Sequence, residues 1–231
     1  MKGFLGMFRN NLKKIVAKFP EAWQQNFKRH YYSWRIFSGS FGADEPEYTW
    51  VEAIIRPDDW VIDIGANVGH YALKFSKLVG KNGRVIALEP VPRTFHLLTA
   101  NMENSSFQNV TLLNVAASDK NTVRYVNVPT SQTGMHNYYR ASIIKNDSSL
   151  NVFCIKIDSL LLSNKIALVK IDVEGHELAV LSGMNELLKR DHPYLIVEAS
   201  SETIINYLKS YGYINENIPG SPNYVFTYPW K

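Results

Sequence analysis

Short apolar runs alternate with segments of helical periodicity along most of the chain. Residues 60–64 (WVIDI) form one apolar run, a glycine-containing turn follows, and apolar side chains then recur at helical spacing over residues 68–79. Further apolar runs lie at residues 84–88, 110–116, 166–171 and 194–197, with predicted helices at residues 93–103, 178–188 and 203–209. This alternation predicts βαβ units, and so an α/β fold with a mostly parallel sheet and helices on both faces.

Several short runs interrupt this rhythm. Residues 122–128, 142–145 and 152–157 read as short strands, which predicts a small β insertion before the fourth strand of the sheet. The polar segment 129–140 between them is the candidate loop for acceptor recognition. Residues 224–228 predict a final strand, paired as in a hairpin, and therefore one antiparallel strand in the sheet.

Residues 1–40 differ from the rest of the chain in charge. Residues 1–37 hold eight Lys or Arg against Glu21 alone, a net charge of +7 in a chain whose total is +4, so the remainder carries −3. Apolar residues recur there at helical spacing, with a break at Pro20. We therefore predict a basic amphipathic helical arm at 1–40 and a body at 41–231. The favoured role of the arm is packing on the body; an anionic membrane surface is the second choice, and nucleic acid the last.

Composition bounds the class of protein. With 231 residues, 45% of them hydrophobic, the chain suits one α/β domain with an additional segment. Its single cysteine excludes an internal disulfide framework and a cysteine-based zinc site. No run approaches the roughly 18 apolar residues of a membrane span, and the first residues lack the apolar run of a secretory signal. We expect a cytoplasmic protein, with membrane association through the arm as the open alternative.

The turn after residues 60–64, within VIDIGANVG, indicates which nucleotide binds. Gly65 permits a tight turn and Gly69 a close approach of helix and strand. A dinucleotide fingerprint would need glycines where Asn67 and His70 stand, and Asp63 at the strand end repels a pyrophosphate. S-adenosylmethionine (SAM) has no phosphate and carries an ammonium and a sulfonium, so this turn favours SAM over a nicotinamide or flavin nucleotide.

The ends of the next two strands complete the predicted cofactor site. Glu89, followed by Pro90, ends the second strand and can accept both ribose hydroxyls. Ala117 follows the third strand and leaves room for a flat base, while Ser118 or Asp119 could accept from its amino group. For Asp119 a simple turn carboxylate is the alternative.

A second polar cluster follows the fourth strand. Asp172, Glu174 and His176 lie within five positions, and Gly175 permits a sharp turn among them. His176 titrates near neutrality and is the first candidate for a general base, followed by Glu174 and Asp172. The alternatives are a structural hydrogen bond for His176 and orientation of cofactor or substrate for Asp172. Oxygen ligands here would suit magnesium, but we expect no metal.

These motifs resemble the FkbM-type methyltransferases, a family of class I SAM-dependent enzymes. The resemblance rests on VIDIGANVGHYAL, on Glu89-Pro90, on the NVAASD loop, on IDSL at 157–160 and above all on LVKIDVEGHE, and covers about residues 45–200. It implies a seven-stranded Rossmann-like domain that transfers a methyl group, usually to a hydroxyl of a sugar, polyketide or other natural product. The chain lacks an Asn/Asp-Pro-Pro-aromatic string after the fourth strand, which favours oxygen over nitrogen as the acceptor.

The leading prediction is thus an O-methyltransferase acting on a small-molecule or glycan acceptor. The alternatives are a nicotinamide-nucleotide oxidoreductase and a non-enzymatic nucleotide-binding module tethered by its basic arm to membrane or nucleic acid. The candidate catalytic residues are His176, Glu174 and Asp172. The candidate cofactor-binding residues are Asp63, Gly65, Asn67, Gly69, Glu89, Pro90, Ala117, Ser118, Asp119 and Asp172.

Overall fold

The computed structural model describes most of the chain. The described residues are 19, 21–38, 41, 45–103, 105–128, 142–144, 150–198 and 201–229. The whole of the predicted recognition loop 129–140, and residues 1–18 of the predicted arm, lie outside them.

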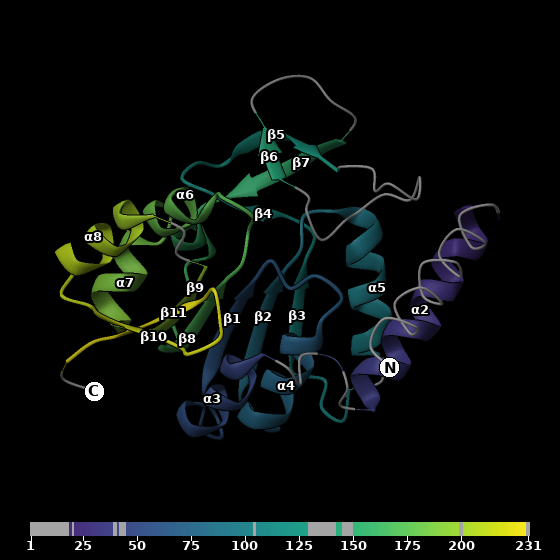
Figure 1. The fold of residues 1–231 in the computed structure, drawn as a ribbon, viewed down its shortest axis with the longest axis horizontal. Coiled ribbons are helices and arrows are strands. Elements are labelled where there is room, and N and C mark those ends of the chain that lie inside the picture. Colours follow the sequence, from purple (N-terminus) through teal and green to yellow (C-terminus); the bar gives the residue numbers. More distant parts are fainter. Residues whose placement is uncertain are drawn as a thin grey trace.

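A seven-stranded sheet forms the centre of the molecule (Figure 1). Its strand order is β10-β11-β9-β8-β1-β2-β3. The strands are β1 (Trp60–Ile64), β2 (Arg84–Leu88), β3 (Val110–Leu113), β8 (Ile166–Ile171), β9 (Tyr194–Val197), β10 (Ile214–Asn217) and β11 (Tyr224–Thr227). Every neighbouring pair is parallel except the two that involve β11. This confirms the predicted mostly parallel sheet with one antiparallel strand.

Helices cover both faces of this sheet, because alternate side chains of its buried strands point to opposite sides. One face packs against α3 (Pro46–Ile54), α4 (His70–Val79) and α5 (Pro92–Met102), with Val61 and Val85 in the same core as Phe75. The other face packs against α6 (Glu177–Ser182), α7 (Asn185–Asp191) and α8 (Glu202–Ser210), with Ile62 in the same core as Leu181. Asp63 therefore lies on the α3–α4 side.

The predicted helix over residues 178–188 is wrong in one respect, because the structure has two helices there. The helical segment is interrupted at Gly183, between α6 and α7. A Cβ atom on Gly183 would lie 1.9 Å from the carbonyl oxygen of Ser118. The loop after β3 thus passes against the end of α6, and only glycine fits at this point.

A second, four-stranded sheet lies over the carboxyl ends of the central strands (Figure 1). Its strands are β4 (Ala116–Ala117), β5 (Thr122–Asn127), β6 (Ser142–Ile144) and β7 (Leu150–Ile155), in the order β4-β7-β5-β6. The 3-10 helix η2 (Ile157–Leu160) then leads into β8. The predicted β insertion is confirmed, but the predicted third strand ends early: it stops at Leu113, and Ala116 and Ala117 belong to the second sheet.

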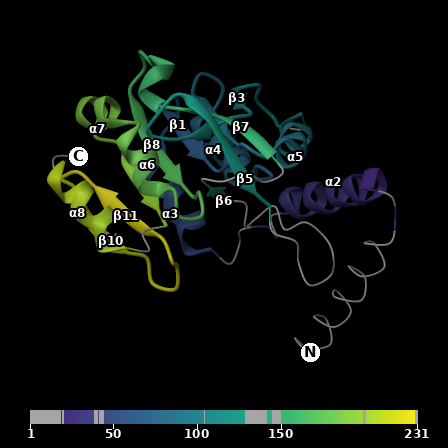
Figure 2. The same cartoon turned by 90° about the horizontal axis from the view of Figure 1, so that it is seen from above.

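Helix α2 (Glu21–Phe37) lies beside α5, at the end of the molecule opposite α8 (Figure 2). Ile36 is buried against Val68, Leu73 and Leu97. Within the described residues, no helix is long and apolar enough to span a bilayer. The division into an arm and a body stays a prediction.

Candidate functional site

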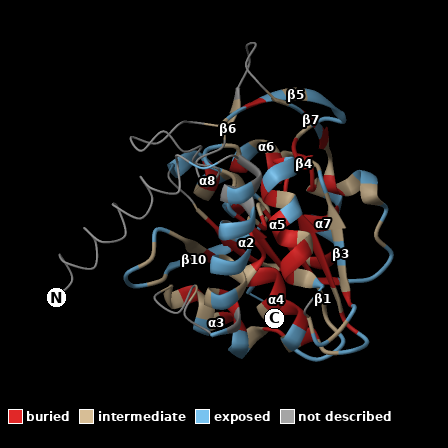
Figure 3. Ribbon diagram, turned by 90° about the vertical axis from the view of Figure 1, so that its right-hand side faces the viewer, coloured by how far each residue is buried: buried red, intermediate tan, exposed pale blue. Residues whose placement is uncertain are grey.

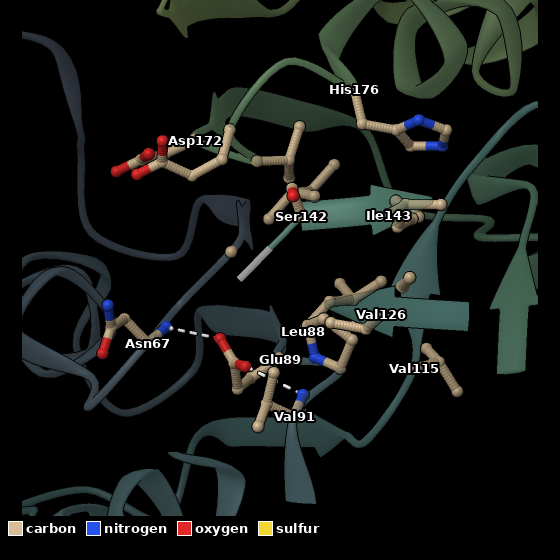
Figure 4. A pocket seen from close by; sticks show the side chains of 17 residues that line it. Asn67, Leu88, Glu89, Val91, Val115, Val126, Ser142, Ile143, Asp172 and His176 are labelled. Atoms are coloured by element: carbon tan, nitrogen blue, oxygen red, sulfur yellow. Dashed lines mark hydrogen bonds between the residues drawn. The ribbon is translucent and has the colours of Figure 1, made fainter. Parts of the chain in front are cut away.

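A cavity lies where the carboxyl ends of β1, β2 and β8 meet the second sheet (Figure 4). Open α/β sheets bind their ligands at this edge. The lining residues are Ile64, Gly65, Asn67, Leu88, Glu89, Pro90, Val91, Val115, Ala116, Ala117, Val126, Ser142, Ile143, Asp172, Val173, Glu174 and His176. Both sheets therefore contribute to its walls.

The turn after β1 is shaped by close contacts. The backbone amides of Gly65 and Ala66 both donate to the carbonyl oxygen of Leu88, at 3.0 and 2.9 Å. Gly65 has a φ of +80°, and a Cβ atom there would lie 1.9 Å from the carbonyl oxygen of Asp172. At Gly69 a Cβ atom would lie 2.5 Å from Leu98 Cδ1. The two glycines thus allow the loops after β1 and β8 to meet and α4 to pack against α5.

Glu89 is fixed by two backbone amides, one from the turn after β1 and one from its own loop after β2 (Figure 4). Its Oε2 accepts from the Asn67 amide at 3.1 Å and its Oε1 from the Val91 amide at 2.9 Å. Asn114 Nδ2 donates to the Glu89 carbonyl oxygen at 2.8 Å and holds the loop itself. Burial raises the pKa of Glu89 to about 7, although the two amides act in the opposite direction. A carboxylate has about four acceptor positions, so two remain for a ligand's hydroxyls.

A buried charge cluster lies below the cavity. The register of β1 and β8 places Asp63 and Lys170 side by side. Lys170 is 3% exposed, and its Nζ lies 2.9 Å from Asp172 Oδ2 and 4.7 Å from the centre of the Tyr71 ring. Tyr71 donates its hydroxyl hydrogen to Glu45 Oε2 at 2.8 Å. The ammonium of Lys170 thus interacts with the carboxylates of Asp172, Asp63 and Glu45.

The charges in this cluster depend on one another. Burial alone would lower the pKa of Lys170, but Asp172 and Asp63 outweigh it and the pKa is raised. The same ammonium lowers the pKa of Asp172, so this carboxylate at the cavity wall stays ionised. Asp63 is fully buried, and burial raises its pKa. Neither of its carboxylate oxygens has a hydrogen-bond partner of standard geometry among the described residues.

His176 lines the cavity and is hydrogen-bonded to a chain of polar side chains that lies behind the cavity wall. Ser118 Oγ lies 2.9 Å from His176 Nε2 and 3.0 Å from Asp119 Oδ1, and Arg124 Nη2 lies 3.2 Å from the same Asp119 oxygen. The pKa of Asp119 is lowered by these two partners against the opposing effect of burial. An ionised carboxylate only accepts, so it takes the single hydroxyl hydrogen of Ser118.

This arrangement sets the tautomer of His176. Since Ser118 donates to Asp119, its oxygen has to accept a hydrogen from His176 Nε2. Nδ1 is then the nitrogen with the free lone pair. Burial, with a smaller effect of Arg124, lowers the pKa of His176. The imidazole is therefore neutral, and able to accept a proton, at neutral pH.

The structure brings most of the predicted site residues to one cavity. Gly65, Asn67, Glu89, Pro90, Ala117, Asp172, Glu174 and His176 all line it. Four others do not: Asp63 is buried below it, Gly69 caps α4, and Ser118 and Asp119 lie behind the wall that Ala117 forms. Ser118 is fully buried and already engaged, so the geometry does not support it as a partner for an adenine amino group. The roles of all these residues stay predictions.

Several contributors were missed from the sequence. Lys170 is one, although a lysine inside an apolar strand is an unusual signal. Ser142 and Ile143 of β6 line the cavity without any motif around them. In the part of the chain that the structure describes, no three His, Cys, Asp or Glu side chains are arranged to hold a metal ion.

The cavity fits SAM. Glu89 offers free acceptor positions for the ribose hydroxyls, and Ala117 leaves space for the base. Asn67 Oδ1 is buried without a hydrogen-bond partner among the described residues, so it can accept a hydrogen bond from a ligand donor such as an ammonium group. Asp172 adds a negative charge suited to a cationic ligand.

Comparisons with known proteins agree with this geometry. Residues 63–214 match the family described as the Methyltransferase FkbM domain. The chain is 31% identical over 144 residues to the hexuronic acid methyltransferase AglP of Haloferax volcanii, an alignment that covers 61% of this chain and 56% of that protein. The chain thus spans little more than half the length of this curated relative.

Solved structures share the fold. An FkbM methyltransferase from Methylobacillus flagellatus superposes with a TM-score of 0.55 at 18% identity, over 80% of this chain and 50% of that one. A Streptococcus mutans protein determined with S-adenosylhomocysteine (SAH) gives a TM-score of 0.50 at 11% identity, over 79% of this chain and 94% of that one. These likenesses confirm the seven-stranded class I methyltransferase fold.

Proposed function

Because the chain belongs to the FkbM family of SAM-dependent methyltransferases, we propose that it methylates a hydroxyl group of a sugar or glycan. The observation that carries this proposal is His176, a neutral imidazole at the cavity wall whose Nε2 is occupied and whose Nδ1 lone pair is free. A hydroxyl acceptor has to lose its proton during methyl transfer, and this nitrogen can take it. The family also decides against the nicotinamide alternative.

The residues of the cavity divide the work of the reaction. When bound, SAM would supply an electrophilic methyl carbon; the acceptor oxygen would bond to this carbon in line as the carbon–sulfur bond breaks and SAH leaves. Glu89 and Asn67 would hold the cofactor, and alignment of two reactants is worth up to about 7–11 kcal/mol. His176 would take the acceptor proton, a contribution of roughly 10²–10⁴-fold. Asp172 would orient the cofactor or the acceptor, since its charge is held at the wall by Lys170.

Two observations support oxygen and sugar as the acceptor. The segment after β8 reads Asp172-Val173-Glu174-Gly175, without the Asn/Asp-Pro-Pro-aromatic string of amino-directed nucleic-acid methylation. The relative AglP is named for a hexuronic acid. Such a sugar offers two nucleophiles, its hydroxyls and its carboxylate. The carboxylate is ionised at neutral pH and needs no base, so a base at the cavity favours a hydroxyl.

The test compares two matched acceptors, a hexuronic acid glycoside and the neutral hexose glycoside of the same configuration. Each is incubated with SAM and the protein, and methylated products are detected by mass spectrometry. Mild alkali removes a methyl ester and leaves a methyl ether intact. We expect an alkali-stable product from at least one acceptor, and an alkali-labile product alone would refute hydroxyl methylation.

The base is tested with His176→Ala, with His96→Ala on the exposed side of α5 as the matched control. We expect turnover to fall by roughly 10²–10⁴-fold in the first variant and to stay unchanged in the second. SAH affinity should be similar in both. Full turnover of His176→Ala would exclude this residue as the base.

A further inference from the structure

Helix α2 carries a stripe of exposed aromatic side chains. Trp23 is 67% exposed, Phe27 59%, Tyr31 41% and Trp34 67%. At about 100° per residue these four positions fall within an arc of about 80°, and at about 1.5 Å per residue they extend over about 17 Å. We call these four residues the aromatic stripe. Large apolar side chains gathered on one exposed helix face indicate a surface that meets an apolar partner.

The opposite side of α2 holds the helix on the body. Ile36 is buried in a cluster with Leu97 of α5, and Tyr32 packs against the same cluster. Arg29 Nη2 lies 3.6 Å from Glu103 Oε2 at the end of α5. Figure 3 shows α2 in front of the buried core, with much of its described surface exposed. The aromatic stripe is therefore not needed for docking α2 on the body, and it faces outward.

The charge around the aromatic stripe points to its partner. The stripe lies in the segment 1–37, which carries +7, while the rest of the chain carries −3. Trp and Tyr prefer the boundary between water and lipid, and Lys and Arg are attracted to anionic headgroups. A second copy of this chain would bring two segments of +7 together and is disfavoured by repulsion. Duplex nucleic acid binds mainly through its phosphates and gives an outward aromatic stripe of this length little to bury.

We propose that the aromatic stripe docks the protein on an anionic phospholipid surface, with α2 lying in the plane of the interface. A helix in this position inserts its apolar face a short way into the headgroup region, and basic residues contact the headgroups. The methyltransferase body then stays in water beside the membrane, where it meets acceptors displayed on that surface. This inference rests on the aromatic stripe of α2 and on the charge of residues 1–37, and not on the identity of the acceptor.

The test is co-sedimentation of the full chain with vesicles. One set consists of phosphatidylcholine alone and the other of equal parts phosphatidylcholine and phosphatidylglycerol. The variant Trp23→Ser/Trp34→Ser removes both exposed indoles, and Phe153→Ser, 69% exposed on β7, is the matched control. SAH binding, measured on each protein by calorimetry, shows that the body is intact and keeps this test separate from the proposed methyl transfer.

We expect binding to the anionic vesicles only, weakened by salt. The double Trp variant should lose about tenfold or more of its vesicle affinity, since each indole buries a large apolar area, whereas Phe153→Ser should bind like the wild type. Failure of the wild type to bind anionic vesicles would overturn the proposal, as would equal binding by the double Trp variant. A dimer that becomes monomeric in the double Trp variant, seen by analytical ultracentrifugation, would instead assign the stripe to a second copy. Salt-sensitive binding of duplex DNA that the double variant loses would assign it to nucleic acid.

Discussion

Replacing Lys170 by Met tests the buried charge cluster below the cavity. The substitution keeps a long unbranched side chain but removes the ammonium that lies 2.9 Å from Asp172 Oδ2. Asp63, the neighbour of Lys170 across the two strands, is 0% exposed. It would remain in the core of the sheet without the ammonium of the neighbouring strand.

The expected cost follows from this geometry. The side chain of Lys170 is 3% exposed but that of its ion-pair partner Asp172 is 44% exposed. We therefore expect a cost below the about 3–5 kcal/mol of removing one partner of a fully buried pair, out of the roughly 5–15 kcal/mol that stabilise a typical domain. Lys170 also lowers the pKa of Asp63, which burial raises, so the pKa of Asp63 rises further in the variant. A carboxyl with a raised folded-state pKa contributes stability that is present at low pH and is lost as pH rises through that pKa. The deficit of the variant should therefore be larger at about pH 8 than at about pH 5.

Urea unfolding at these two pH values measures the effect. Lys165→Met is the matched control, because Lys165 is exposed just before the same strand and its replacement should stay within about 0.5 kcal/mol of wild type. The double variant Asp63→Asn/Lys170→Met should be more stable than Lys170→Met at the higher pH, since Asn needs no counter-ion. Equal unfolding free energies for Lys170→Met and Lys165→Met at both pH values would refute the coupling. A deficit independent of pH would refute the assignment to the charge of Asp63.

Three further changes test the cavity itself. Because the pKa of Glu89 is raised to about 7, SAH affinity measured by calorimetry should increase as pH rises through that value. Glu89→Gln should weaken SAH binding by about 10–100-fold and remove the pH dependence. A wild-type SAH affinity that does not change with pH would contradict the role of Glu89. Ser118→Ala should remove the hydrogen bond that fixes the tautomer of His176, so the imidazole tautomer seen by ¹⁵N NMR should change and kcat should fall by about tenfold or more. An unchanged tautomer would contradict the hydrogen-bond assignment. Gly65→Ala should abolish SAH binding because its Cβ has no room. Gly80→Ala, with a φ of +69° and a ψ of −169° but no atom within 4 Å of its Cβ, should cost about 1–3 kcal/mol of stability through backbone strain and leave SAH binding unchanged. Intact binding by Gly65→Ala would show that the turn after β1 can move.

The sequence predicted the strands and the cavity edge well for physical reasons. Buried parallel strands are short continuous apolar runs, and the carboxyl ends of such strands meet at one edge of the sheet. Glu89, Asp172 and His176 each follow such a run and do line the same cavity. Position relative to a strand end was therefore sufficient to bring together residues that are as far apart as 87 positions.

The sequence could not supply contacts made between distant loops. Ser118 and His176 are 58 positions apart, and nothing local in either segment indicates their hydrogen bond. The helix break at Gly183 depends on the carbonyl oxygen of Ser118, which a periodicity argument does not include. Lys170 lies within an apolar run of the sequence, and its role becomes visible only when the register with β1 places it beside Asp63.

The sharing of the cavity between two sheets has a kinetic consequence. Ala116 and Ala117 of β4, Val126 of β5 and Ile143 of β6 form one wall, while the turns after β1 and β2 form the other. Each catalytic cycle has to replace SAH by SAM, and the ligand has to leave past the edge of the second sheet. We expect the rate of SAH release to depend on how readily this sheet separates from the strand ends below it. Substitutions in the β5–β6 hairpin should change how long SAH stays bound, even where they leave the methyl-transfer step untouched.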